Sequence, residues 1–579
     1  MSKLSVDQQS VLSLFSDKKA DFLIPDYQRP YAWTEEECET LWDDIFNFAF
    51  PNNNKDNFNG DDEYYLGPIV TFKNDDGKQE IIDGQQRLTT LMLLLRAFYV
   101  KFGEAMDNNT VETRKKIASC IWKTDEFGNP NKNELKIDSE VATDNDKDEF
   151  LQILKSGETT KEQESKYAKN YRFFQAKIND FADRFSMYVT YFPIRVLNNC
   201  ILLPIEADNQ DTALRIFSTL NDRGMPLSDS DIFKAQFYNY YKSLGKKDEF
   251  IKTWKKLEND TKEIFPFSNA PMNELFTRYM YYERAKKRIT SSTTEALRKF
   301  YETNKYELLK NEDTLKNLVD LSDFWKDVNN QNEERFDDEI LKRLYVLNYS
   351  PNGMWNYLLS VYYLQNRDLE RNKLLNFLNK IIAFTFAYYF INPGVNALRT
   401  PVYKEMIKII DGKDVDFREY LFDENSLRTT INNFEFSNQR TITKSMLTWW
   451  AFENPNQQLM YLDEYYEIEH IYAKNRENNE HQLMNKKNIE SLGNKAILEK
   501  RINIRASDYR FEDKKKYYLG YTNNRGQRKE KTSNQELIDL TQKNDFTESD
   551  IENRFSNMIN KFIDYLKKEK LIKYLELGE

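Results

Sequence analysis

The pattern of apolar and polar positions predicts a mixed α/β domain over residues 1–240. Residues 88–98 carry apolar side chains at helical spacing and predict a helix directly after a strand. Thr34 and Glu37 have the spacing of a capping box and predict the start of another helix. Three short apolar runs bounded by turn residues predict strands at 22–24, 66–72 and 80–82.

The pattern changes after residue 240. Residues 241–440 show almost purely helical patterns without a fixed-period repeat, and predict a helical domain with an aromatic core. In the last domain, 441–579, alternation over 467–472 predicts a strand. The polar stretch 122–165 predicts an insertion or a mobile loop. The chain is therefore expected to be an α+β multidomain protein.

Composition excludes several classes of protein. With 40% hydrophobic and 31% charged residues in 579, the chain can bury several cores and is not disordered. The three cysteines, Cys38, Cys120 and Cys200, form no CxxC pair, which argues against a disulfide scaffold or a Cys-based zinc site. The longest apolar run, 381–391, is about half of the roughly 20 residues that a membrane span needs. We expect a soluble, cytoplasmic protein without a membrane partner.

Charge is distributed unevenly. The chain has 84 Lys and Arg against 94 Asp and Glu, a net charge of −10. Residues 495–531 nevertheless contain 12 basic and 5 acidic residues, a local net charge of +7. A basic segment in an acidic protein is typical of a phosphate-binding surface, although a solvated charged face is an equal alternative.

Histidine is scarce, which narrows the search for an acid–base catalyst to His470 and His481. His481 lies in a polar run and is expected to be a loop residue. Glu469 directly precedes His470 on the predicted strand, and Asn494 and Asn503 follow it by 24 and 33 residues. A metal-dependent nuclease needs a base, an orienting amide and oxygen ligands, and these residues supply those groups. An ordinary surface histidine among unrelated asparagines is the alternative.

A second candidate site lies between the strand at 80–82 and the following helix. A glycine allows close backbone approach, a helix N-terminus offers free N–H groups, and Arg87 adds a forked cation, which together suit a phosphate. Asp83 is expected to hold a metal ion or a ribose hydroxyl. The alternative is a structural turn with Arg87 in an ion pair. The chain has no GxxxxGK[ST] motif, so NTP hydrolysis here would not use a P-loop.

Two further segments carry candidate ligand groups. Tyr27, Gln28 and Arg29 precede a proline in extended geometry and suit stacking and hydrogen bonding to a nucleotide or base edge; strand-edge packing is the alternative. Asn221 and Arg223 lie in a turn before a helix with a predicted capping box, from which Arg223 could reach the same phosphate.

The C-terminal motif resembles an HNH nuclease module of the ββα-metal type. The similar residues are Glu469–Ile471, Leu492–Leu498 and Asn503. The resemblance implies that His470 is the general base, that Asn494 orients it, and that Glu469 and Asn503 bind Mg²⁺ or Mn²⁺. The acidic residue before the histidine is often Asp in this family, so Glu469 departs from the family pattern. The tail after the module, with the expected DNA contacts Lys514 and Lys515, resembles one HNH subfamily.

That subfamily is usually fused to the other motifs of this chain. Residues 24–33, 81–91 and 220–228 resemble the N-terminal domain of GmrSD-type, modification-dependent (type IV) restriction endonucleases. That domain is an NTPase with a ParB/sulfiredoxin-like fold. The resemblance implies an NTP site formed by Asp83, Gly84, Gln85, Gln86, Arg87, Thr89, Asn221 and Arg223.

The resulting hypothesis is a bacterial, NTP-dependent endonuclease that nicks or cuts double-stranded DNA in defence against phage, with modified DNA as the expected target. A homo-oligomer is compatible with it. Two alternatives remain open. One is an NTP-binding regulatory or DNA-binding protein with a degenerate HNH module, and the other is a toxin-like nuclease that acts on unmodified DNA.

Overall fold

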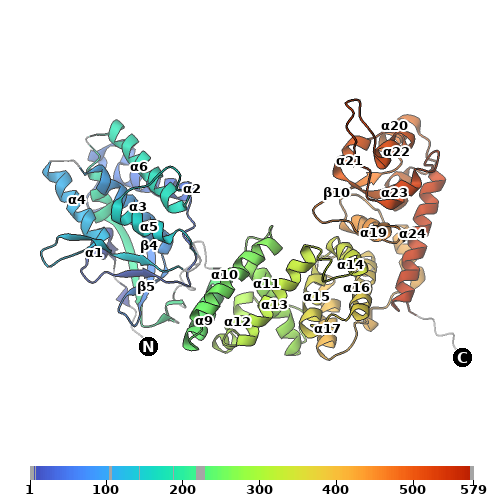
Figure 1. The fold of residues 1–579 in the computed structure, drawn as a ribbon, viewed down its shortest axis with the longest axis horizontal. Coiled ribbons are helices and arrows are strands. Elements are labelled where there is room, and N and C mark those ends of the chain that lie inside the picture. Colours follow the sequence, from blue (N-terminus) through green and yellow to red (C-terminus); the bar gives the residue numbers. More distant parts are fainter. Residues whose placement is uncertain are drawn as a thin grey trace. The chain divides into compact units, whose positions relative to one another are not determined.

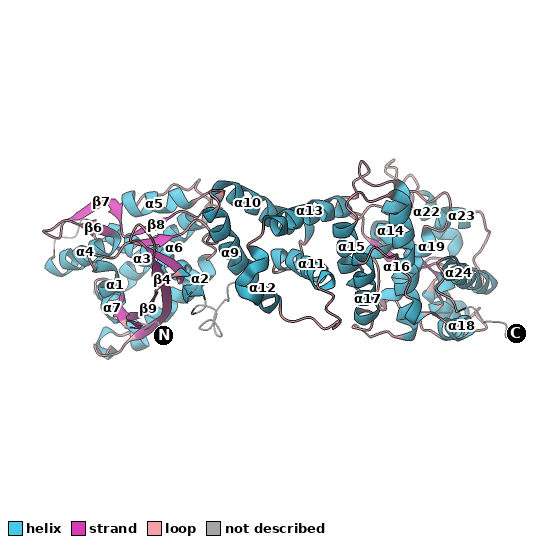
Figure 2. Ribbon diagram, turned by 90° about the horizontal axis from the view of Figure 1, so that it is seen from below, coloured by secondary structure: helices cyan, strands magenta, loops and turns pink. Residues whose placement is uncertain are grey.

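The computed structural model describes residues 5–6, 8–103, 107–141, 144–186, 188–210, 212–214, 216, 228–394 and 396–573. The chain divides into two compact units, Met1–Lys255 and Lys256–Glu579, and each is described by itself (Figures 1 and 2). The motif residues Asn221 and Arg223 lie outside the described residues.

The first unit is built around a seven-stranded mixed sheet in the order β1-β9-β4-β5-β3-β8, with β2 also paired to β9. At its centre β4 pairs in parallel with β9 and antiparallel with β5, while β3 pairs in parallel with β5 and β8. The strands β6 and β7 form a separate antiparallel pair. The bounds are β1 Ser5–Val6, β2 Gln9–Ser10, β3 Phe22–Ile24, β4 Tyr64–Lys73, β5 Gln79–Asp83, β6 Trp122–Thr124, β7 Pro130–Leu135, β8 Ile137–Ser139 and β9 Cys200–Ala207.

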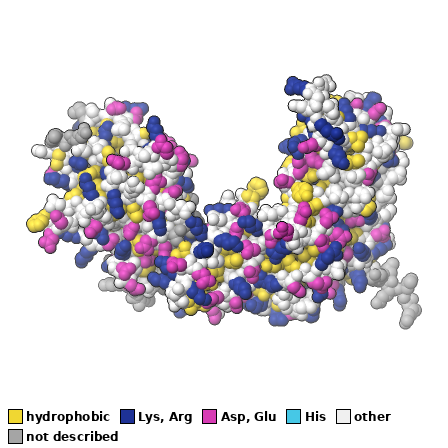
Figure 3. Space-filling view, in the orientation of Figure 1, with side chains coloured by type: hydrophobic (Ala, Val, Ile, Leu, Met, Phe, Trp, Pro, Cys, Tyr) yellow, Lys and Arg dark blue, Asp and Glu magenta, His cyan; other side chains and the backbone are white. Residues whose placement is uncertain are grey.

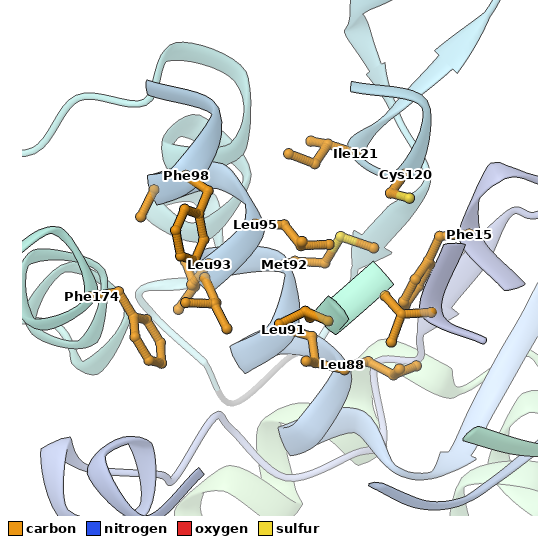
Figure 4. Packing of buried hydrophobic residues seen from close by; sticks show 14 of the residues in the cluster. Phe15, Leu88, Leu91, Met92, Leu93, Leu95, Phe98, Cys120, Ile121 and Phe174 are labelled. Atoms are coloured by element: carbon orange, nitrogen blue, oxygen red, sulfur yellow. The ribbon is translucent and has the colours of Figure 1, made fainter. Parts of the chain in front are cut away.

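Helix α3, which directly follows β5, forms the centre of this unit's core. Its leucines pack with Phe15 of α1 and Phe174 of α6 (Figure 4). The predicted capping box at the start of α2 is confirmed, because the Thr34 N–H donates to Glu37 Oε2 over 2.6 Å. The helices are α1 Val11–Ser16, α2 Glu35–Ala49, η1 Pro51–Asn53, η2 Lys55–Asn57, α3 Gln85–Lys101, α4 Asn108–Ile121, α5 Lys147–Ser156, α6 Lys166–Arg184, α7 Tyr191–Asn199, α9 Asp229–Ser243 and α10 Lys247–Ile264, which runs into the second unit.

Of the two alternatives predicted for residues 122–165, an insertion or a mobile loop, the mobile loop is wrong. This stretch contains β6, β7, β8 and α5, and β8 is an edge strand of the main sheet. Ile137, Phe150, Ile153 and Leu154 are fully buried in the core of the unit. The stretch looks like a loop because only a few apolar residues in each element face the core and the surrounding positions are polar.

The second unit is helical apart from one pair of strands among its described residues. These strands are β10 Tyr466–His470 and β11 Lys495–Glu499. The helices are α11 Pro271–Lys286, α12 Leu297–Tyr306, η3 Glu307–Leu309, α13 Glu312–Asn329, α14 Asp338–Asn348, α15 Met354–Gln365, α16 Arg371–Ile391, α17 Arg399–Ile410, η4 Arg418–Tyr420, α18 Glu424–Asn432, α19 Thr441–Ala451, α20 Lys474–Glu480, η5 Lys486–Glu490, η6 Leu492–Asn494, α21 Lys500–Ala506, α22 Phe511–Leu519, α23 Gln535–Leu540 and α24 Glu548–Lys568.

The predicted boundary near residue 440 falls inside this unit. Helix α24 packs on helices from before this boundary: the Tyr565 hydroxyl donates to the Asn379 carbonyl of α16 over 2.9 Å, and Arg428 of α18 donates from Nη1 to Asn560 Oδ1 over 2.8 Å. Helix α16 is the one described helix long and apolar enough to cross a membrane, and 67% of its apolar window is buried inside the unit. It therefore has the burial of a core helix.

Substitution of Gly493 is expected to test how closely α24 packs on η6, the 3-10 helix before β11. An added Cβ at Gly493 would lie 2.1 Å from the Ile551 carbonyl oxygen and 2.9 Å from the Phe555 nitrogen, both in the backbone of α24. We expect Gly493→Ala to lower the free energy of unfolding by roughly 1–3 kcal/mol or more, because helix backbone cannot rotate away as a side chain can. Urea unfolding measures the loss. Gly394→Ala, whose Cβ would lie 3.8 Å from its nearest neighbour, is the control, and equal stabilities would contradict the packing.

Candidate functional site

An antiparallel strand pair followed by a helix brings the C-terminal motif together. Strand β10 pairs with β11 so that His470 lies opposite Lys495 and Tyr466 opposite Glu499. Helix α21 begins directly after β11 and carries Asn503 back over the strands, where its amide reaches Glu467 of β10. The order along the chain is therefore strand, strand, helix.

His470 lies at the end of β10 and is mostly buried, with 13% of its side chain exposed. Its Nε2 has no hydrogen-bond partner in the described part of the chain. Burial, reinforced by the positive charge of Lys495, lowers the pKa of His470 to about 4. The imidazole is therefore neutral near pH 7 and keeps a lone pair free to accept a proton.

Glu490, which belongs to none of the sequence motifs, is the carboxylate nearest to this imidazole. Its Oε2 lies 3.6 Å from His470 Nε2, longer than a hydrogen bond, and 2.6 Å from Lys495 Nζ. Lys474 pairs with its other oxygen. Burial opposes ionisation of Glu490, but the two lysines outweigh it and lower its pKa to about 2. Glu490 therefore stays negative and is placed to stabilise a positive charge on His470.

Asn494 is fully buried and holds the chain just after His470. Its Oδ1 accepts from the Tyr472 N–H over 2.7 Å, and its Nδ2 donates to the carbonyls of Tyr472 and Ile489 over 3.0 Å each. No hydrogen bond between described atoms joins Asn494 to the imidazole of His470. Any orienting effect of Asn494 therefore acts through the backbone, which makes it a positioning residue.

Glu469 faces away from solvent and forms a buried ion pair. Its Oε1 accepts from Lys514 Nζ and from the Tyr518 hydroxyl, each over 2.7 Å. Burial raises the pKa of Glu469, and the bonds from Lys514 and Tyr518 oppose that effect. Lys514 also donates to the His470 carbonyl over 2.6 Å and is 1% exposed, so burial and these two partners favour a structural role for Lys514 over a contact with DNA. The neighbouring Lys515 is partly exposed, with its ammonium 5.5 Å from the Phe511 ring.

Asn503 contacts Glu467 and not Glu469, the carboxylate with which it is expected to share a metal ion. Its Nδ2 donates to Glu467 Oε2 over 3.0 Å, and within the described ranges no hydrogen bond links it to Glu469. Glu467 and Glu469 lie two residues apart on β10 and so share one face of the strand pair. No cluster of three or more His, Cys, Asp or Glu with metal-binding geometry occurs among the described residues. The oxygen donors at this position come from one amide and two carboxylates.

The surface over this end of the second unit is rich in cations. Figure 3 shows Lys and Arg side chains in dark blue over the region that Figure 1 labels α20, α21 and α22. Lys516, Arg525, Arg528 and Lys531 of the basic segment are exposed. This agrees with a phosphate-binding surface beside β10 and α21.

In the first unit, the expected phosphate site forms at the start of α3. Gly84 adopts the left-handed conformation, with φ of 95°, and its N–H donates to Asp83 Oδ1 over 2.7 Å. Arg87 donates from Nη1 to the Pro68 carbonyl over 2.9 Å. Burial raises the pKa of Asp83, with the positive charges of Arg87 and Arg29 opposing it. Two guanidinium groups therefore act on one carboxylate at a helix N-terminus.

The glutamine side chains of the two N-terminal motifs hold those motifs against each other. Gln86 Oε1 accepts from the Ala32 N–H over 2.7 Å, and Gln85 Nε2 donates to the Arg29 carbonyl over 3.2 Å. Gln28 Nε2 donates back to the Ile81 and Ile82 carbonyls over 3.3 Å. These side-chain amides are hydrogen-bonded to backbone atoms of the other motif. The structure therefore favours a structural role for them over direct contact with a ligand.

Two other motif residues, Tyr27 and Thr89, are also buried. Tyr27 is buried, its hydroxyl donates to Glu80 Oε2 over 3.2 Å, and its ring lies 5.1 Å from that of Tyr238. Thr89 is 2% exposed in α3. For Tyr27 the alternative of packing is therefore favoured. Arg29 remains half-buried, and its charge acts on Asp83 and on Asp231 at the start of α9.

Two family models match the chain and together span both sites. Residues 11–238 match the model described as GmrSD restriction endonuclease, N-terminal domain. Residues 412–561 match the model described as GmrSD restriction endonucleases, C-terminal domain. A comparison with curated proteins found no match. The first match contains the start of α3, and the second contains β10, β11 and α21.

Proposed function

The chain belongs to the GmrSD restriction endonuclease family, and on this premise we propose that it is an NTP-dependent HNH endonuclease that nicks or cuts modified phage DNA. The family supports a restriction-type nuclease with DNA as its substrate. The observation that carries the finer proposal is the buried, neutral imidazole of His470, with an unpartnered Nε2, at the end of a strand–strand–helix arrangement.

In this proposal His470 acts as the general base. Nε2 accepts a proton from the attacking water, and the imidazolium that forms is stabilised by Glu490 at 3.6 Å. Asn494 fixes the backbone at Tyr472 and so keeps the imidazole in place. The exposed cations around α21 and α22 hold the DNA backbone.

The oxygen donors on the face of β10 that carries Glu467 and Glu469 suit a hard divalent cation, because Mg²⁺ and Mn²⁺ prefer oxygen ligands. Asn503 and Glu469 are the residues proposed to hold it, with Glu467 as the nearby second carboxylate. When bound, the ion supplies positive charge beside the scissile phosphate. Lys514 balances the charge of Glu469 in the structure described here.

An NTP is proposed to bind at the N-terminus of α3. The free N–H groups of the first turn, with Arg87 and Arg29, would face its phosphates, and Gly84 allows close approach. Gln85 and Gln86 contribute backbone N–H groups in this arrangement, since their side chains hold the motif at 29–33. Asp83 is the group proposed to hold a metal ion or a ribose hydroxyl.

Arg87→Ala is expected to lower NTP affinity about ten- to a hundred-fold, because one forked, charge-assisted contact to phosphate is lost. The measurement is NTP hydrolysis at limiting NTP, with far-UV circular dichroism to verify the fold, since Arg87 also bonds the Pro68 carbonyl. Arg184→Ala, an exposed arginine of the same unit, is the control. A folded Arg87→Ala protein with wild-type hydrolysis would show that the turn is merely structural.

The proposed function is tested by plasmid relaxation and by digestion of phage DNA with and without base modification. We expect cleavage that needs Mg²⁺ and NTP, stops with chelator and prefers the modified DNA. A regulatory protein with a degenerate HNH module would bind DNA without relaxing it. A toxin-like nuclease would cut both DNAs equally.

A further inference from the structure

A cavity of about 690 Å³ opens in the helical part of the second unit. Its walls come from the end of α10 and the following loop, from α11, α13 and α14, and from the start of α15. Figure 2 shows α11, α13 and α15 close to one another. None of the lining residues belongs to the two sites described above. The volume is within the range of small-molecule sites in proteins.

Arg278 of α11 lines this cavity with unused hydrogen-bonding capacity. It is 7% exposed, and its Nη1 donates to the carbonyl and to the carboxylate of Glu274 over 3.1 Å each. Its Nε is buried and has no hydrogen-bond partner in the described part of the chain. A buried donor without an acceptor is costly, so its presence in a cavity wall indicates a ligand that supplies acceptor atoms.

Flat aromatic surfaces surround this guanidinium. Its centre lies 4.4 Å from the Phe265 ring centroid and 5.1 Å from that of Trp325. Trp355 packs edge-on to Trp325, with the ring centroids 5.7 Å apart. Phe267 is fully exposed at the cavity, where the fold gives it no partner to cover its ring. Such surfaces favour a flat ligand that stacks.

Side-chain amides supply the polar part of the lining. Asn330, Asn348 and Asn356 line the cavity, and their side chains form no hydrogen bond with any other residue that the structure describes. By contrast, Asn329 of the same cavity donates to the Ile264 carbonyl over 2.8 Å. An asparagine amide carries donors and an acceptor side by side, which matches the edge of a nucleobase.

We propose that this cavity binds a nucleobase, stacked on its aromatic residues, with Arg278 and the three free amides reading the base edge. A bare phosphate would leave the rings unused, and an aliphatic ligand would leave Arg278 and the amides unpaired. The inference rests on the proposed function in that DNA supplies the base, extruded from the duplex. A free nucleotide is the other source of the same chemistry.

Photocross-linking with 5-iodouracil tests the proposal, because the excited base joins to aromatic side chains that it contacts. One arm uses a duplex oligonucleotide with a single 5-iodo-deoxyuridine, and the other uses free 5-iodo-deoxyuridine monophosphate. Cross-linked peptides of the full chain are identified by mass spectrometry. We expect the duplex to label the peptide with Phe265 and Phe267 or the peptide with Trp355.

Variants make the test quantitative. Phe267→Ala is expected to lower the cross-link yield and the affinity for duplex DNA about ten-fold or more, since one stacking surface is lost. Its full exposure means that folding does not depend on it. Phe127→Ala, which removes a 90% exposed phenylalanine of the first unit, is the matched control. Asn330→Ala provides a second, polar variant at an exposed position, which avoids the risk that Arg278→Ala fails to fold.

The outcomes separate this inference from the nuclease proposal. Labelling of the cavity by the duplex supports the inference with DNA as the source, and labelling by the free nucleotide alone supports a nucleotide site. Cross-links elsewhere, together with unchanged DNA affinity of both variants, overturn it even if the protein cleaves DNA. If the protein neither binds nor cleaves DNA, the nuclease proposal fails, and the free-nucleotide arm still decides the cavity's ligand.

Discussion

His470→Ala is expected to lower DNA cleavage at least about a hundred-fold while leaving NTP hydrolysis near the wild-type rate. A general base contributes roughly 10²–10⁴ to the rate, and His470 carries the one imidazole with a buried, unpartnered nitrogen among the described residues. Plasmid relaxation measures cleavage. The pKa of about 4 gives a second readout: the base is neutral above that value, so wild-type cleavage should fall as the pH drops toward 4.

The matched control is the second histidine. His481 ends α20 in the left-handed conformation, with φ of 50°, so His481→Asn keeps that backbone with little strain. We expect this variant to cleave DNA like the wild type. If His470→Ala still nicks plasmid at a comparable rate, His470 is not the base.

Lys514→Met is expected to lower the free energy of unfolding by about 3–5 kcal/mol, because it leaves the Glu469 carboxylate buried without its cation. The two side chains of the pair are 1% and 5% exposed, so water cannot replace the lysine. Urea unfolding of the full chain measures the loss. The loss should shrink at acidic pH, because burial raises the pKa of Glu469 and its protonated form then costs less to bury.

Two further variants separate charge burial from packing. Lys514→Met combined with Glu469→Gln should recover much of the stability, since no uncompensated charge remains. Lys516→Met, which changes an exposed lysine two residues away, should have little effect. A loss in Lys514→Met no larger than that in Lys516→Met would mean that the pair does not form in solution.

Local pattern was enough to predict the elements that carry the N-terminal site. The strands expected at 22–24, 66–72 and 80–82 correspond to β3, β4 and β5, and the helix expected at 88–98 lies within α3. The capping box at Thr34 is confirmed, and so is the one predicted for the helix after the motif with Asn221 and Arg223, where Ser228 caps α9. The resemblance to the GmrSD family is confirmed by the two family models. These features depend on residues within a turn or two of one another, so the linear sequence contains them.

The polar contacts of the sites could not be predicted in this way. Lys514 looks like any lysine of a basic segment, yet it is buried against a carboxylate 45 positions earlier. The bonds that Gln86 makes to the segment at 32–33 span more than 50 positions. Glu490 has no distinguishing neighbour in the sequence, and only the return of β11 alongside β10 places it near His470.

The sequence by itself determined the strands at 22–24, 66–72 and 80–82 with the helix that follows them, the family, and the choice of His470 as the candidate base, because periodicity and motif spacing are local properties of the chain. Only the tertiary structure decided which charges are buried, which amides bind backbone and which remain free. The burial of a charge depends on its removal from water, and the partner of an amide depends on which distant segments pack beside it. Neither property can be read from a single position in the sequence.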